Sequence, residues 1–208
     1  MPISSDFDRG FVILADSQPV PAAGFHLRLT GHHTQSLFPD LFVLRFWNPS
    51  EAVHWQLRNA HFLEVSHGET LLASGEIADI TQETAPEGEL LTVSFALGLS
   101  FRASFVSLSV PAGVTAADTV RLLLSAAASS FQLLTDPDPN PVFTRPQAFH
   151  GRLTDTIEDV LSACDAVPYL VPSGIALRTR AAAPVDIYID MDTVSGPWIR
   201  ETLQEGRT

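Results

Sequence analysis

The sequence contains no lysine, so all 12 of its basic residues are arginines. Aspartate and glutamate together number 24, and the formal net charge is -12 at pH 7. Nucleic acids and anionic membranes are bound through clustered cations, and so acidic a chain repels both. The composition argues against a protein that wraps nucleic acid or binds a membrane by bulk electrostatics. It is compatible with a protein that surrounds DNA without holding it.

Cysteine and long apolar runs are also scarce. The single cysteine, Cys164, excludes an internal disulfide, and its place on an apolar helical face predicts a packed thiol rather than a nucleophile. No segment reaches the roughly 18 apolar residues of a membrane-spanning helix. Residues 1–8 lack the basic and apolar regions of an export signal. We expect a globular chain that is made in the cytoplasm and kept there unless another component carries it out.

The first half of the chain has the hydrophobic pattern of strands. Hydrophobic residues make up 45% of the 208 residues, enough to bury a core. Alternation of apolar and polar residues predicts half-buried strands, and continuous apolar runs predict more deeply buried ones. These patterns occur at residues 11–15, 25–29, 41–47, 62–65, 71–80, 91–97 and 106–110. Ser50 can begin one or two helical turns, and Gly75 marks a bulge or a close approach within its strand.

The stretch from Val114 to Arg180 predicts a helix, a short strand, a second helix and a β-hairpin. Thr115 and Asp118 form a helix-start signal, which Asp155 and Glu158 repeat. Apolar residues follow each signal at helical spacing. The short strand is expected at residues 131–134, and the hairpin turn at Pro172-Ser173-Gly174.

These patterns together predict a mainly β fold with a small α/β part. We expect an N-terminal arm at residues 1–9 and an antiparallel β-barrel-like domain at 10–112. A small helix–strand–helix–hairpin domain is expected at 113–180, and a final strand with a polar tail at 181–208. The loop at 136–141 alternates proline with acid or amide and is expected to be exposed and stiff.

The histidines and acids form no recognisable metal or catalytic pattern. No histidine pair has the i, i+4 spacing of a metal site on a clear helix; the most closely spaced are His32, His33, His54, His61 and His67. Asp136, Asp138 and Asn140 resemble the start of a calcium loop, but Pro141 replaces the required glycine and the closing acid is missing. We therefore interpret the histidines as structural or surface residues and the acidic loop as solvated.

Two pairs of acids could in principle carry chemistry. Asp190 and Asp192 could hold a divalent ion with a nucleotide-sugar phosphate, but no nucleotide-binding unit precedes them. Glu64 and Glu76 have partly apolar neighbours, as one carboxylate of a glycosidase would, yet solvated faces of a barrel explain both. There is also no Gly-x-Ser-x-Gly elbow and no phosphate loop. We predict no catalytic residue, no cofactor and no metal site.

Four aromatic residues lie between positions 42 and 55, and few basic residues are interleaved with them. A stacking platform for nucleic acid needs such cations. We therefore expect these aromatics in a core or a subunit interface; they are Phe42, Phe46, Trp47 and Trp55.

Taken in order, several segments resemble those of the tail hub proteins of bacteriophages, the family of late control proteins and the Mu-like baseplate hub. The run 41–48 followed by Ser50 resembles the strand and turn that open the hub barrel, and 61–68 with 71–77 resembles its next passage. Five further segments resemble parts of the small α/β domain of these hubs; they are residues 113–118, 122–126, 149–151, 154–161 and 174–177. The resemblance covers roughly residues 10–190.

The resemblance implies a virion structural protein and not an enzyme. It would form a ring, expected to be a homotrimer, that joins the tail tube to the baseplate or tail tip in the virion tail. Tail-tube, tail-tip and possible tape measure proteins would be its partners, and DNA would pass during genome ejection without specific binding. Such hubs commonly continue into a second barrel, whereas this chain stops soon after Asp192.

Two alternatives stay open at this point. A hub or spike module of a type VI secretion system or a tail-like bacteriocin would have the same fold and another cargo. A small β-rich carbohydrate-binding or hydrolase domain would instead show a concave site with perturbed acids, or an exposed row of aromatics.

Overall fold

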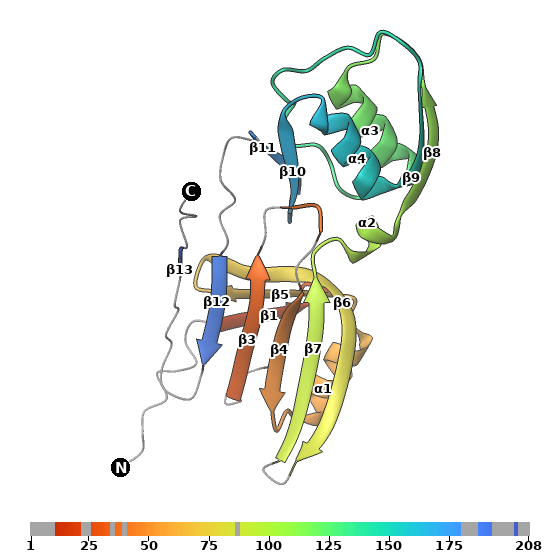
Figure 1. Cartoon of the computed structure of the whole chain (residues 1–208). Coiled ribbons are helices and arrows are strands. Elements are labelled where there is room, and N and C mark those ends of the chain that lie inside the picture. The colour runs from red at the N-terminus through yellow and green to blue at the C-terminus, as the bar shows by residue number, and fades with distance from the viewer. Residues whose placement is uncertain are drawn as a thin grey trace. The chain divides into compact units, whose positions relative to one another are not determined.

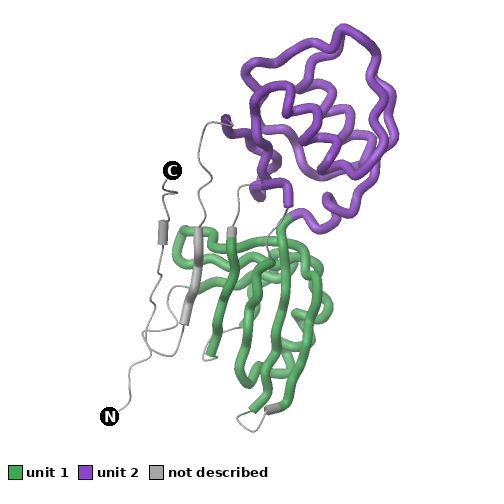
Figure 2. The backbone as a smooth tube through the Cα atoms, in the orientation of Figure 1, with its two compact units in different colours: residues 1–33, 40–97, 186–204 green, residues 34–39, 98–185, 205–208 purple. Residues whose placement is uncertain are grey.

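The computed structural model describes residues 11–21, 26–33, 36–38, 41–85, 88–179, 187–192 and 202–203. The chain forms two compact units (Figure 2). The first contains residues 1–33, 40–97 and 186–204, and the second contains residues 34–39, 98–185 and 205–208. The expected N-terminal arm at residues 1–9 lies outside the described residues. No helix in the described ranges is long and apolar enough to cross a membrane.

The first unit contains a nine-stranded antiparallel sheet in the order β13-β12-β3-β4-β7-β6-β5-β1-β2 (Figure 1). Its strands are β1 (Phe11–Ala15), β2 (Gln18–Pro19), β3 (His26–His33), β4 (Phe42–Trp47), β5 (Phe62–His67), β6 (Thr70–Ala85), β7 (Gly88–Ala96), β12 (Ile187–Asp192) and β13 (Thr202–Leu203). Among the described residues β2 and β13 do not pair, so the sheet does not close. The predicted fold class, mainly β with a small α/β part, is confirmed, with an open curved sheet in place of a closed barrel.

Strand β6 bends the sheet. Its first part, up to Glu76, pairs with β5, and its second part pairs with β7, with a register shift between Ile77 and Asp79. Gly75 stands just before this shift, where a Cβ atom would lie 2.1 Å from the backbone carbon of Ala96. The predicted close approach at Gly75 is thus confirmed. Because β6 curves, β1 and β5 lie across one face of the layer of β3, β4 and β7 (Figure 1).

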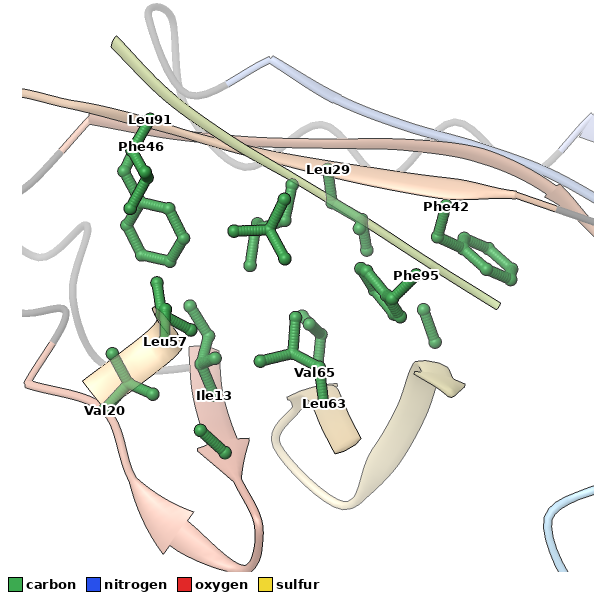
Figure 3. Packing of buried hydrophobic residues seen from close by; sticks show 14 of the residues in the cluster. Ile13, Val20, Leu29, Phe42, Phe46, Leu57, Leu63, Val65, Leu91 and Phe95 are labelled. Carbon is green, nitrogen blue, oxygen red and sulfur yellow. The ribbon is translucent and has the colours of Figure 1, made fainter. Parts of the chain in front are cut away.

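The core of the first unit lies between these two layers. Figure 3 shows the side chains of β1 and β5 facing those of β3, β4 and β7; the labelled residues include Ile13, Leu63, Val65, Leu29, Phe42, Phe46 and Phe95. Helix α1 (Glu51–Asn59) adds Val53 and Leu57, both fully buried. Ser50 caps this helix as expected, because its hydroxyl accepts a hydrogen bond of 3.4 Å from Val53 N.

The second unit packs two helices against a two-stranded ribbon. Its elements are α2 (Leu99–Ala103), β8 (Phe105–Val110), α3 (Ala116–Ala126), β9 (Gln147–Arg152), α4 (Leu153–Ser162), β10 (Ala166–Val171) and β11 (Gly174–Thr179). The predicted cap of α3 is confirmed, since the Thr115 hydroxyl accepts a hydrogen bond of 3.1 Å from Asp118 N. The predicted hairpin is also confirmed, with Val171 opposite Gly174.

The two units differ from the expected domain ranges at their junction. The second unit begins at Gly98, whereas the sequence pattern suggested residue 113. The reason is that β8 pairs with β9, which lies far along the chain between α3 and α4. The strand expected at 131–134 is reduced to a single bridge between Leu133 and Ile175.

Candidate interaction surfaces

The histidines lie in separate contacts. No three histidine, cysteine or acidic side chains in the described ranges stand close enough to hold a metal ion. His54 Nε2 lies 2.9 Å from Glu89 Oε1, and His61 Nδ1 lies 3.6 Å from Asp16 Oδ2. The His67 ring packs 4.6 Å from that of Phe11. The side chain of His33 falls outside the described residues.

The contact between His54 and Glu89 belongs to a polar network that joins α1 to the hairpin of β6 and β7. Arg58 Nη2 donates a hydrogen bond of 2.7 Å to Gln82 Oε1, and Gln82 also hydrogen-bonds Glu89. The backbone N–H of Glu89 donates to Asn48 Oδ1 at 2.8 Å. These contacts indicate that His54 and Glu89 are structural residues, because they hold α1 against the β6–β7 hairpin.

Asp16 has a comparable structural role in the turn after β1. Its carboxylate accepts hydrogen bonds from the backbone N–H groups of His61, at 3.1 Å, and of Phe62, at 2.9 Å. Burial by itself would raise the pKa of this carboxyl, but the hydrogen bonds from Phe62 and His61 outweigh it and lower the pKa. Ionised Asp16 therefore joins the β1–β2 turn to the start of β5.

The acidic loop at residues 136–141 was expected to be solvated, but it contacts the N-terminus of α3. Asn140 Oδ1 accepts a hydrogen bond of 3.0 Å from Ala117 N, which is one of the unpaired amides of the first helical turn. Arg121 pairs with both Asp118 and Asp136. Hydrogen bonds from the Thr115 hydroxyl and from Arg121 lower the pKa of Asp118. Two of the three oxygens that suggested a calcium loop thus have protein partners.

Glu64 and Glu76 are neighbours on adjacent strands. Glu64 pairs with Ser74 and Phe62 pairs with Glu76, so the two carboxylates are diagonal neighbours on one face of β5 and β6. This face is opposite to that of Leu63 and Val65 in the core. The structure therefore brings the two candidate acids together on the sheet face turned away from the core.

The other candidate residues from the sequence are buried or have side chains outside the described residues. Cys164 is fully buried in the turn that follows α4, and burial raises the pKa of its thiol, so the predicted packed thiol is confirmed. Phe42 and Phe46 lie in the core as expected. The side chains of Asp190 and Asp192, in β12, are outside the described residues.

Exposed aromatic side chains are the surface feature that hydrophobic periodicity did not identify. Trp55 on α1 is 71% exposed, and Phe105 at the start of β8 is 61% exposed. Trp55 was expected in a core or an interface, and within the described chain it is not in the core. Phe105 lies on a strand whose alternation was recognised, but only the position of β9 shows which face is covered.

Comparison with known proteins finds solved structures of similar fold, and two of them are tail proteins. No protein-family model matches the sequence, and no curated protein gives a significant match. The tail protein from Neisseria meningitidis MC58 has a TM-score of 0.61 and 14% identity, over 81% of this chain and 49% of that one. The 43 kDa tail protein of prophage MuSo2 from Shewanella oneidensis has a TM-score of 0.56 and 12% identity, over 83% and 55%. The chain spans about half the length of each, and at such identities the likeness shows a shared fold.

Proposed function

We propose that this chain is a structural component of a bacteriophage or prophage tail. The observation that carries the proposal is the fold likeness, over 81% of the chain, to a protein that is itself a tail protein. A second tail protein of similar fold supports it. Fold likeness alone leaves function open, so the arrangement of the polar residues has to be considered as well.

The polar side chains of the described residues favour a structural role over catalysis. Each cluster with a hydrogen-bonding network fastens one element to another: His54 and Glu89 hold α1, Asp16 holds the start of β5, and Arg121 holds the loop before β9. Glu64 and Glu76 lie on the strand face turned away from the core of the first unit.

Within the tail, the finer proposal is a hub ring between the tail tube and the baseplate or tip. We propose a homotrimer, which contacts tail-tube and tail-tip proteins and lets DNA pass without binding it specifically. The net charge of -12 supports this role, because an acidic surface repels passing DNA rather than retaining it. We also propose that another segment or protein completes the ring; the chain spans about half the length of each of the two tail proteins.

The test is peptide mass spectrometry of tail particles purified from a culture with the gene intact and from a deletion strain. We expect the protein in the particles at a few copies each, in a multiple of three, and we expect assembled tails to be lost in the deletion strain. Complementation with the intact gene should restore them. Normal tails in the deletion strain, together with absence of the protein from particles, would contradict the tail role itself.

A separate measurement addresses the finer proposal. Purified tails can be cross-linked and the products sized, which reports whether copies of this chain contact each other. A trimer is the expected product. A monomer flanked only by other tail proteins would leave the tail role standing and exclude the homotrimeric ring.

A further inference from the structure

The ribbon of β8 and β9 has one covered face and one open face. Val106 and Val110 are buried on the face toward the helices, which lie on one side of the ribbon in Figure 1. Every residue of the opposite face is exposed; these residues, called here the outer ribbon face, are Phe105, Ser107, Ser109, Ala148, His150 and Arg152. Within the described chain β8 and β9 pair only with each other, so no further strand shields this face.

The outer ribbon face has an apolar anchor beside a cation. The Phe105 side chain is 61% exposed, and its ring meets that of His150 edge-on with centroids 5.3 Å apart. Phe105 also lies directly opposite Arg152 in the strand register. The rest of the face carries only small side chains. Exposed aromatic and arginine side chains on a flat surface are typical of the centre of a protein interface.

The outer ribbon face is also free of acid, although the chain as a whole is strongly acidic. Residues 98–117 and 139–154 contain no aspartate or glutamate, whereas the whole chain has 24 in 208 residues. These are the two stretches that pair to form the ribbon. They carry Arg102, Arg145 and Arg152, and none of the three has a carboxylate within ion-pair distance among the described residues. The face is therefore complementary to a negatively charged partner.

Arg152 lies at the N-terminus of α4, where a positive charge destabilises the helix. It is the N-cap residue of α4, and its side chain makes no capping hydrogen bond. The N-terminus of a helix carries partial positive charge, so an arginine there is repelled while an aspartate or serine would be attracted. A residue that opposes local stability without a compensating contact in the described structure indicates a use outside the fold.

We propose that the outer ribbon face docks an acidic, extended segment of a partner protein. A carboxylate of the segment would pair with Arg152, and an apolar side chain would pack on Phe105. An extended segment fits because its alternate side chains project onto one surface at the spacing of the strands below. Single-stranded nucleic acid is disfavoured by the net charge of -12 and by the presence of a single aromatic rather than a row. The proposal does not depend on the tail role.

The experiment measures binding of defined probes to the full chain by fluorescence anisotropy at low ionic strength. The probes are a labelled peptide in which glutamate alternates with valine, the same peptide with lysine in place of glutamate, and a single-stranded DNA oligonucleotide. We expect only the glutamate peptide to bind, and added salt to weaken it. Amide chemical shifts should change within residues 105–110 and 147–152.

Two variants assign the binding to this face. Arg152→Glu should weaken the glutamate peptide roughly tenfold or more, and Phe105→Ser should weaken it independently. Arg152→Glu should also raise the melting temperature of the second unit slightly, since a carboxylate suits a helix N-terminus; lost binding therefore cannot be ascribed to unfolding. Arg58→Glu makes the same charge change on α1 and should leave binding unchanged.

The following results would overturn the proposal. They are equal binding of the glutamate and lysine peptides, unchanged affinity in Arg152→Glu, and binding of the DNA oligonucleotide in place of the peptide. Chemical shift changes confined to the first unit would overturn it as well, because they would place the binding elsewhere.

Discussion

The two units are built on different kinds of information. The first unit depends on strand pairings between distant residues, and its bend requires the absence of a side chain at Gly75. The second unit has one such distant pairing, between β8 and β9, but it begins its helix α3 with a local signal, the Thr115 cap, and forms the β10–β11 hairpin between neighbours in sequence. A fold made of long-range pairings is sensitive at the residues that bend it, whereas a fold made of local elements tolerates the loss of one signal. The following experiments test this difference, beginning with the largest expected effect.

Replacement of Gly75 by valine should disrupt the first unit. The new Cβ would meet the backbone of Ala96 at 2.1 Å, and the backbone cannot yield as a flexible side chain would. We expect a loss of about 3 kcal/mol or more in the free energy of unfolding of that unit. The measurement is urea denaturation with circular dichroism. Gly68→Ala is the control: nothing lies within 4 Å of its added atom, and its φ of +58° adds a backbone cost of about 1 kcal/mol. Equal losses in both variants would contradict the close-approach argument.

Core truncations should separate the units. Phe46→Ala removes a fully buried ring from the first core, and Ile157→Ala removes a fully buried side chain from the second. Each should cost about 2–5 kcal/mol in its own unit. Hydrogen exchange followed by mass spectrometry reports the two units separately. Loss of protection in both units from either substitution would show that they unfold as one cooperative body.

Loss of the helix cap at Thr115 should have a smaller and more local effect. Thr115→Ala leaves the Asp118 amide without its hydrogen-bond acceptor, and we expect a cost of about 1 kcal/mol in the second unit. Ser50→Ala, the equivalent change at α1, should cost less, because the network of His54, Arg58 and Gln82 still holds that helix. Thermal unfolding of both variants gives the comparison. A larger loss for Ser50→Ala would show that the polar network contributes little.

The smallest effects concern pH, and Asp16 of the first unit and Glu158 of the second contribute with opposite signs. The pKa of Asp16 is lowered in the fold, so its stabilising contribution is present above the unfolded pKa and is lost as pH falls through the folded pKa. Burial, together with Asp155 and Asp159, raises the pKa of Glu158 on α4. Its protonated form is thus favoured in the fold, and its contribution is present below the unfolded pKa and lost as pH rises through the folded one.

Two substitutions make these contributions visible. Asp16→Asn should flatten the decline in stability of the first unit in acid, and Glu158→Gln should raise the stability of the second unit at neutral pH while changing it little in acid. The measurement is stability as a function of pH from about 3 to about 7, a range that brackets the ordinary carboxyl pKa values. A Glu158→Gln variant less stable than the parent at neutral pH would refute the assigned sign.

Much of the fold was predictable because it is written in short-range patterns. The strands, the caps at Ser50 and Thr115 and the close approach at Gly75 all follow from residue spacing or from a single residue type, and the structure confirms them. The position of β9 was missed, because its sequence, Gln147–Arg152, has a glycine and polar residues and becomes a strand only by pairing with β8. The bridge at Leu133 shows the converse, a strand-like run with too few partners to form a strand.

The candidate surfaces were less predictable than the fold. Sequence alone could list Glu64, Glu76 and the histidines, but it could not show that the two glutamates share one face or that the histidines lie apart. Asn140 was interpreted as part of a solvated loop, whereas it accepts a hydrogen bond from the first turn of α3. Such partners are separated widely along the chain, and no local pattern specifies them.

The sequence by itself determined the composition of this protein: its excess of acid, its lone buried thiol, its strand and helix periodicities and its turns. These depend on neighbouring residues, whose spacing sets which side chains share a face. Tertiary structure decided which strands pair, where the two units divide, and that the acid-free stretches around β8 and β9 meet on one exposed face. The physical reason is that burial and charge complementarity are properties of surfaces, and a surface exists only once distant segments have come together.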